Sequence, residues 1–80
     1  MQIRIYTKSH CSFCYAAKHL LARRGLEYDE ILVLDVTIEQ EMQELTGNLS
    51  VPQIVIDGTP IGGYAELAVM DRGGGLQATA

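Results

Sequence analysis

The sequence has only two cysteines, few basic residues and no long apolar run. With Cys11 and Cys14 as its whole complement of cysteine, the chain has no framework of structural disulfides, and a reducing cytosol is the compartment that we expect. Six Lys and Arg against ten Asp and Glu give a net charge of −4, which argues against nucleic-acid binding because that needs a basic surface. The longest aliphatic run, residues 31–34, is too short to span a membrane.

Length and composition indicate one small domain, residues 1–80. Eighty residues, 48% of them hydrophobic, bury about 60–65% of the surface of the extended chain on folding. The sequence has no internal repeat and no low-complexity tract. Residues 1–4 lead directly into a strand pattern, so we expect no signal peptide. Residues 73–80 begin with three glycines, and we expect them to form a mobile tail.

The two cysteines lie at a predicted strand-to-helix turn. A strand pattern over residues 2–6 runs into the polar segment 7–10, and a helical pattern begins near Cys11. Positions i and i+3 lie on one face of a helix, so Cys11 and Cys14 are close enough to form a disulfide. The unpaired N–H groups and the dipole at the helix start favour a thiolate at Cys11, and the nearby Lys8 adds to this. The sequence therefore predicts Cys11 as the nucleophile and Cys14 as the resolving thiol.

Two other interpretations of the cysteine pair are open. The pair could be half of a zinc site, although zinc takes four ligands and the other candidates are only His10 and His19. The two thiols could instead be inert and buried, because free cysteine packs as a small hydrophobic residue. The strand–turn–helix setting favours a redox pair over both, since it is the setting of a redox-active Cys-x-x-Cys motif.

The first helix is expected to run from about residue 11 to residue 24, with Gly25 as its C-terminal stop. Its buried stripe is predicted at Phe13, Cys14, Ala17, Leu20 and Leu21. The second strand lies within residues 28–35. Its uninterrupted apolar run, 31–34, is typical of a parallel strand that is covered on both faces.

A second helix is expected to begin at Thr37, because Thr37 and Gln40 have the spacing of a capping box, and to end at Gly47. Its buried stripe is predicted at Ile38, Met42, Leu45 and Leu49. Met42 in this stripe is better interpreted as a core residue than as a ligand.

Two further strand patterns are joined by the hairpin signal Asp57-Gly58. Residues 53–56 form the first, and Pro60 places the second at a sheet edge because proline has no N–H to donate. The pair Gly62-Gly63 precedes a third helix, from residue 64 to about 72. Its inward-facing residues are expected to be Leu67, Val69 and Met70. Glycines at a helix start let an anion approach the N–H groups, although the residues alone favour an ordinary turn over an anion site.

The predicted order β-α-β-α-β-β-α is an α/β architecture of the thioredoxin-like type, with a four-stranded mixed sheet and three helices. Within it, residues 5–76 resemble the glutaredoxins, specifically the short bacterial dithiol members. The matching motifs are Ile5-Tyr6-Thr7-Lys8, Ser50-Val51-Pro52-Gln53-Ile54, Ile56-Asp57-Gly58, Ile61-Gly62-Gly63 and Gly74-Gly75-Leu76.

The resemblance implies roles for the matching residues. Cys11 would attack glutathione mixed disulfides, and Cys14 would resolve protein disulfides. Pro52 would follow a cis peptide bond, although the base rate alone favours trans. The backbone of Val51 would pair with the cysteinyl unit of glutathione, as in strand addition. Lys8 would contact glutathione and stabilise the thiolate.

The start of the third helix is expected to hold the other end of glutathione. The N–H groups of Gly63, Tyr64 and Ala65 would receive the γ-glutamyl carboxylate, and Glu66 would hold the ammonium group. The full set of expected glutathione contacts is Lys8, Phe13, Ser50, Val51, Pro52, Gly63, Tyr64, Ala65 and Glu66. The chain departs from the family where Ser12-Phe13 replaces the usual Pro-Tyr and where Ala65-Glu66 replaces the usual Asp-Asp.

The leading hypothesis is a cytoplasmic, monomeric, glutathione-dependent thiol–disulfide oxidoreductase acting on glutathionylated and disulfide-bearing proteins. A second hypothesis is a glutathione-ligated 2Fe–2S cluster shared by two chains through Cys11. Ser12 is the reason for this hypothesis: the chain resembles the cluster-binding glutaredoxins, which have a small residue in place of the active-site proline. A third is an electron donor that is reduced by a thioredoxin-type reductase.

Overall fold

Strand β1 (Ile3–Thr7) lies at the centre of the sheet. In the computed structural model, which describes residues 1–76, β1 lies between β2 (Asp29–Leu32) and β3 (Gln53–Ile56), and β4 (Thr59–Gly62) borders β3. Strands β1 and β2 are parallel, whereas β3 runs antiparallel to both β1 and β4. The predicted mixed sheet is confirmed, with the strand order β2-β1-β3-β4.

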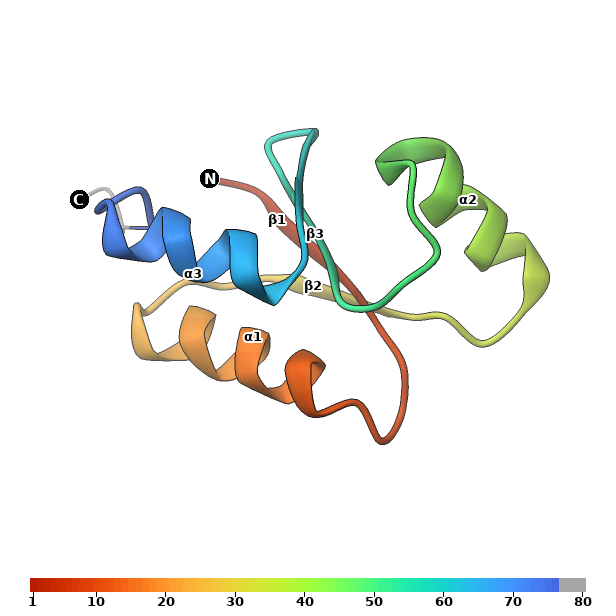
Figure 1. The fold of residues 1–80 in the computed structure, drawn as a ribbon, viewed down its shortest axis with the longest axis horizontal. Helices are drawn as coiled ribbons and strands as arrows, with labels where there is room; N and C mark the ends of the chain where they lie inside the picture. Colours follow the sequence, from red (N-terminus) through yellow and green to blue (C-terminus); the bar gives the residue numbers. More distant parts are fainter. Residues whose placement is uncertain (77–80) are drawn as a thin grey trace.

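Helices cover both faces of the sheet (Figure 1). Helices α1 (Ser12–Arg23) and α3 (Tyr64–Arg72) pack on one face, and α2 (Val36–Thr46) packs on the other. The element order is the predicted β-α-β-α-β-β-α. No helix within residues 1–76 combines the length and the apolar character needed to cross a membrane.

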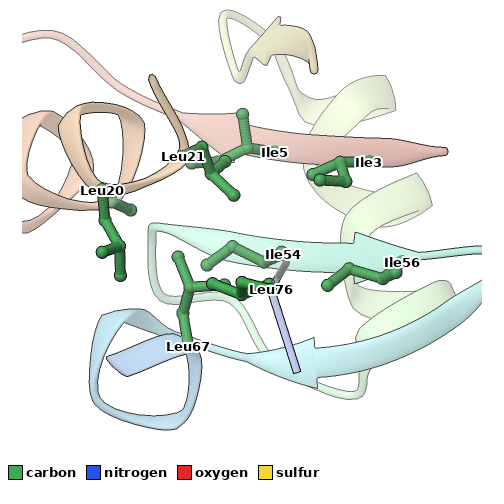
Figure 2. Packing of buried hydrophobic residues seen from close by; sticks show 9 residues of the cluster. Ile3, Ile5, Leu20, Leu21, Ile54, Ile56, Leu67 and Leu76 are labelled. Atoms are coloured by element: carbon green, nitrogen blue, oxygen red, sulfur yellow. The ribbon is translucent and has the colours of Figure 1, made fainter. Parts of the chain in front are cut away.

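The core is divided between these two faces, because successive side chains of a strand point in opposite directions. The cluster beneath α1 and α3 consists of Ile3, Ile5, Ala17, Leu20, Leu21, Ile54, Ile56, Leu67 and Leu76 (Figure 2). The cluster beneath α2 consists of Tyr6, Val33, Met42 and Val55. Strands β1 and β3 contribute to both clusters and therefore hold the two layers together.

The buried stripe predicted for α1 is confirmed except at Phe13. Cys14, Ala17, Leu20 and Leu21 are buried, whereas the side chain of Phe13 is 64% exposed. Phe13 lies in the first turn of α1, and its ring contacts Tyr64 of α3 instead of the core.

The prediction that the second strand is covered on both faces is wrong. Val33 is buried, but Leu32 is exposed and Leu34 is 76% exposed. Strand β2 lies at the edge of the sheet, and the apolar run continues past its end at Leu32 into the loop before α2. The parallel pairing of β2 with β1 is confirmed.

Asp35, and not Thr37, caps helix α2. Asp35 Oδ1 accepts a hydrogen bond of 2.9 Å from the N–H of Ile38. Aspartate is among the preferred N-cap residues, and it lies two positions before the expected cap, so Thr37 falls within the first helical turn. The predicted capping box between Thr37 and Gln40 is therefore wrong.

The end of α2 is predicted correctly, but its stripe is narrower than expected. The helix ends at Gly47, whose φ of +78° suits glycine, and Met42 is fully buried. On α2, Met42 and the partly buried Ile38 pack against the sheet, whereas Leu45 in the last turn is exposed. Leu49 lies beyond the end of the helix and is also exposed.

The C-terminal part of the chain contains two further differences from prediction. The Asp57-Gly58 hairpin and helix α3 form as expected, but Val69 is 59% exposed and does not face inward. Leu76 is 1% exposed and belongs to the core, although the sequence places it in a mobile tail. The rest of that predicted tail, residues 77–80, lies outside the described residues.

Candidate active site

Cys11 is the N-cap residue of α1. Its backbone is extended, and its Sγ accepts a hydrogen bond of 3.2 Å from the N–H of Cys14. The sulfur thus takes the place that a serine or aspartate oxygen takes at other helix starts. The Cys11 side chain is half-buried, so its sulfur can be approached from solvent, and the N–H of Cys14 is placed to hydrogen-bond that sulfur.

Cys14 lies one turn deeper and is only 2% exposed. Burial is the main reason that the pKa of Cys14 is raised to about 11, and the hydrogen bond with Cys11 adds to the rise. The backbone of Lys8 and the charge of Lys18 act in the opposite direction. Both cysteines are free thiols. At neutral pH the pair therefore combines an accessible thiol that is suited to attack with a buried, protonated thiol.

The segment before β3 lies beside Cys11. The Val51–Pro52 peptide bond is cis, as the family resemblance implied, and the carbonyl oxygen of Val51 lies 3.9 Å from Cys11 Sγ. Gln53 Nε2 donates hydrogen bonds to the carbonyl oxygen of Ser50 at 2.9 Å and to its Oγ at 3.2 Å. These bonds hold the segment across the active-site cysteine, a role for Gln53 that the sequence did not indicate.

A groove of about 250 Å³ runs from α1 to the start of α3 past this segment. It is lined by Phe13, Ser50, Val51, Pro52, Gly63, Tyr64, Ala65 and Glu66. Every residue expected to contact glutathione, except Lys8, therefore lies on one surface. A larger hollow of about 520 Å³ is lined by residues 1–3 and 27–29. Neither hollow is lined by a cysteine, but Val51 in the wall of the smaller groove has its carbonyl oxygen 3.9 Å from Cys11 Sγ, so thiol chemistry points to the smaller groove.

Two aromatic rings form one wall of the groove. The ring centroids of Phe13 and Tyr64 are 5.9 Å apart, and the ring planes are tilted by 31°. This separation is in the favourable range for an aromatic pair. The sequence assigned a backbone role to Tyr64, and nothing in its local pattern indicates that its ring pairs with Phe13 from another helix.

Glu66 folds back over the start of α3. Its Oε1 accepts a hydrogen bond of 2.8 Å from the N–H of Gly63, the N-cap residue. Gly62 has a φ of +120°, which strains any other residue, so the turn needs glycine there; a Cβ atom at this position would also lie 2.6 Å from the same oxygen. The N–H groups of Tyr64 and Ala65 lie in the first turn, where a helix provides no acceptor of its own.

The side chain of Lys8 lies away from the groove. Lys8 Nζ is 3.7 Å from Glu39 Oε2 on α2, and the two side chains are 43% and 40% exposed. Its predicted contact with glutathione remains a prediction, whereas its backbone acts to lower the pKa of Cys14.

In the part of the chain that the structure describes, no further ligand joins the two cysteines to complete a zinc site. Within residues 1–76, no three side chains of His, Cys, Asp or Glu gather as they would around a metal ion.

Comparison with known proteins agrees with this site. Residues 3–61 match the glutaredoxin family model. The chain is 39% identical to glutaredoxin 3 of Escherichia coli K12 over 75 residues, covering 92% of this chain and 90% of that protein. The solution structure of glutaredoxin from Brucella melitensis is 38% identical, with a TM-score of 0.82 over 95% of this chain and 84% of that one.

A crystal structure of a buckwheat glutaredoxin–glutathione complex has a TM-score of 0.83 and 27% identity, covering 92% of this chain and 71% of that one. The family match extends over most of the chain, and the fold and the cysteine pair agree with it. This chain therefore belongs to the glutaredoxin family of thiol–disulfide oxidoreductases.

Proposed function

We propose that this protein uses glutathione to reduce glutathione mixed disulfides and protein disulfides through Cys11 and Cys14. The observation that carries the proposal is the groove beside Cys11, which gathers all the expected glutathione contacts except Lys8. The buckwheat relative, which is described in complex with glutathione, supports the same ligand.

The first reaction needs Cys11 alone. Its thiolate attacks the glutathione sulfur of a mixed disulfide, a Cys11–glutathione disulfide forms, and the original S–S bond breaks. The substrate leaves as a thiolate and takes up a proton. A second glutathione thiolate then attacks the adduct, releasing oxidised glutathione and the Cys11 thiolate.

The second reaction, on protein disulfides, also needs Cys14. Cys11 attacks and forms a mixed disulfide with the protein, releasing one protein thiol. Cys14 then loses its proton and attacks Cys11 Sγ, which expels the second protein thiol and leaves a Cys11–Cys14 disulfide. Two glutathione molecules reduce that disulfide and become oxidised glutathione.

Glutathione would be held at three points of the groove. The backbone of Val51 would pair with its cysteinyl unit. The γ-glutamyl carboxylate would accept hydrogen bonds at the start of α3, where the helix dipole favours an anion. Glu66 Oε1 accepts a hydrogen bond from the N–H of Gly63, and its second oxygen can accept a hydrogen bond from the ammonium group of glutathione.

A coupled assay tests the dependence on glutathione. The substrate is the mixed disulfide of glutathione and mercaptoethanol, and NADPH consumption is followed with either glutathione plus glutathione reductase or thioredoxin reductase alone. We expect turnover with the glutathione system. Turnover with thioredoxin reductase only would contradict the proposal and favour the electron-donor hypothesis.

One chain cannot supply all the thiolate ligands of an iron–sulfur cluster by itself. Such clusters take four thiolates, and within the described residues Cys11 is the accessible thiol. Two chains and two glutathione molecules would be needed. Anaerobic reconstitution with iron, sulfide and glutathione tests this hypothesis: a coloured dimer that Ser12→Pro abolishes would support it, and a colourless monomer would end it.

A further inference from the structure

Lys18 is held at a junction of three elements below the active site. It follows Cys14 by one turn of α1, on the same helix face. Lys18 Nζ donates a hydrogen bond of 2.9 Å to Glu30 Oε2 on β2. Thr7 Oγ1, at the end of β1, donates to the same oxygen at 2.7 Å. Lys18 Nζ also lies 4.9 Å from the centroid of the Tyr15 ring.

This junction is less exposed than an ordinary surface ion pair. The side chains of Lys18 and Glu30 are 23% and 32% exposed, and Thr7 is buried. The hydrogen bond to Glu30 is the main reason that the pKa of Lys18 is raised, so its ammonium stays charged. A cation held by several partners keeps one geometry and does not have to be ordered during the reaction.

The charge of Lys18 acts on Cys14, whose thiol must ionise before it can react. Cys14 must lose its proton before it can attack, and burial opposes that loss. The charged and titratable groups around it are Cys11 and Lys18 on α1, and beyond them Glu30, Tyr15 and Tyr28, which face Lys18. Lys18 is the cation among them, and along the helix axis its Cα lies about 6 Å from the Cα of Cys14 and about 10 Å from that of Cys11.

We propose that Lys18, held in place by Glu30 and Thr7, is a positioning residue for the attack of Cys14 on the Cys11 mixed disulfide. Its ammonium stabilises the Cys14 thiolate as the proton leaves. The thiolate then forms the Cys11–Cys14 bond, the bond from Cys11 to the substrate sulfur breaks, and the substrate leaves as a thiolate that takes up a proton. This inference rests on the dithiol reaction proposed above.

Stopped-flow reaction with the aromatic disulfide dithiobis(nitrobenzoate) separates the two attacks. Cys11 attack releases one coloured thiol at a rate that depends on reagent concentration. Cys14 attack then releases the second coloured thiol at a rate that does not. The first phase serves as the reference within each sample, and Cys14→Ser identifies the second phase by removing it.

Lys18→Met should lower the ratio of the second rate to the first by about three- to tenfold at neutral pH and low salt. The deficit should persist as the pH is raised as long as Cys14 stays mostly protonated, below its pKa of about 11, and it should shrink at high salt because screening weakens the interaction. Lys18→Arg keeps the charge and should restore the ratio to within about twofold of the parent.

Glu30→Gln distinguishes charge from structure. Like Lys18→Met, it removes the ion pair. It leaves an amide oxygen that can accept from Lys18 and Thr7, and it removes the negative charge that opposes the ammonium of Lys18. The ratio of the second rate to the first should therefore not fall. Equal slowing by Glu30→Gln and Lys18→Met, or an unchanged ratio in Lys18→Met, would overturn the inference. A parent protein without a second phase would refute the dithiol reaction itself, which is a different result.

Discussion

Cys11 and Cys14 share one turn of a helix, but their surroundings differ. Cys11 is half-buried at the N-cap and accepts an N–H hydrogen bond, whereas Cys14 is buried and burial raises its pKa to about 11. Sequence spacing and the helix start were sufficient to predict this difference in position and burial, because both follow from local geometry.

The side chains of Lys8 and Phe13 were harder to place from sequence. Lys8 pairs with Glu39 of α2, and Phe13 packs on Tyr64 of α3. Each partner comes from a distant helix, and an exposed side chain takes the partner that the tertiary fold brings near it. No local pattern contains that information.

Glu66 allows the contribution of a charge to be separated from that of a helix cap. Glu66→Ala removes both the Gly63 hydrogen bond and the expected ammonium contact. Because a charge-assisted hydrogen bond contributes roughly 1.5–3 kcal/mol, we expect the Michaelis constant for glutathione to rise by about ten- to a hundredfold. Glu66→Gln keeps an acceptor for Gly63 and should show most of that rise with less loss of thermal stability. An unchanged constant in both variants would place the γ-glutamyl group elsewhere.

Among the elements, α2 gives a direct test of helix capping. Asp35 caps it, whereas the sequence pattern indicated Thr37. Asp35→Ala should lower the free energy of unfolding by about 1 kcal/mol, measured by urea denaturation, because the N–H of Ile38 loses its acceptor. Thr37→Ala is the matched control and should have a smaller effect. Equal effects of the two substitutions would mean that Asp35 does not act as the cap in solution.

Helices α1 and α3, which both contribute to the groove, are joined by Arg24 and Asp71. Arg24 Nε lies 2.6 Å from Asp71 Oδ1, and this hydrogen bond is the main reason that the pKa of Asp71 is lowered from its ordinary value of 3.8. A carboxyl whose pKa is lowered by folding stabilises the fold at pH values above its ordinary pKa of 3.8. This stabilisation is lost as the pH falls below 3.8 and through the pKa of the folded state.

Asp71→Asn should therefore flatten the curve of unfolding free energy against pH in that acid range. Glu44→Gln, at an exposed carboxylate of α2, is the control and should leave the curve as in the parent. Parallel curves for the parent and Asp71→Asn would show that the Arg24 contact does not perturb the carboxylate in solution.

Strand β2 shows what an element's own sequence leaves undetermined. The run 31–34 indicated a strand that is covered on both faces, yet Leu34 lies in the following loop and is exposed. Whether a strand is central or at the edge depends on the order of strands in the sheet, and that order is set by the whole chain. The helix ends at Gly25 and Gly47 could be predicted, since a left-handed glycine is a local signal.

At the scale of the whole molecule, the groove is assembled from three separate segments. Phe13 comes from α1, residues 50–52 from the loop before β3, and residues 63–66 from the start of α3. Composition and periodicity could not bring these segments together. The family resemblance could, because it places them on a known arrangement of strands.

The C-terminal turn belongs to this whole-molecule packing. Leu76 is buried among the residues of the α1 and α3 face, so Leu76→Ala should lower the free energy of unfolding by about 2–5 kcal/mol. Val69→Ala removes an exposed aliphatic side chain from α3 and is the control, with an expected change within about 0.5 kcal/mol. Similar values for the two variants would mean that residue 76 is not part of the core.

The central claim is that Cys11 is the attacking thiol and Cys14 the resolving thiol, and trapping of a glutathione adduct on Cys11 tests the claim most directly. Each variant is incubated with oxidised glutathione and analysed by intact-protein mass spectrometry. Cys14→Ser should retain one glutathionyl group on Cys11, because the resolving thiol is absent. The parent should proceed to the Cys11–Cys14 disulfide, and Cys11→Ser should gain no adduct. An adduct on Cys14 in Cys11→Ser, or none on Cys14→Ser, would contradict the account.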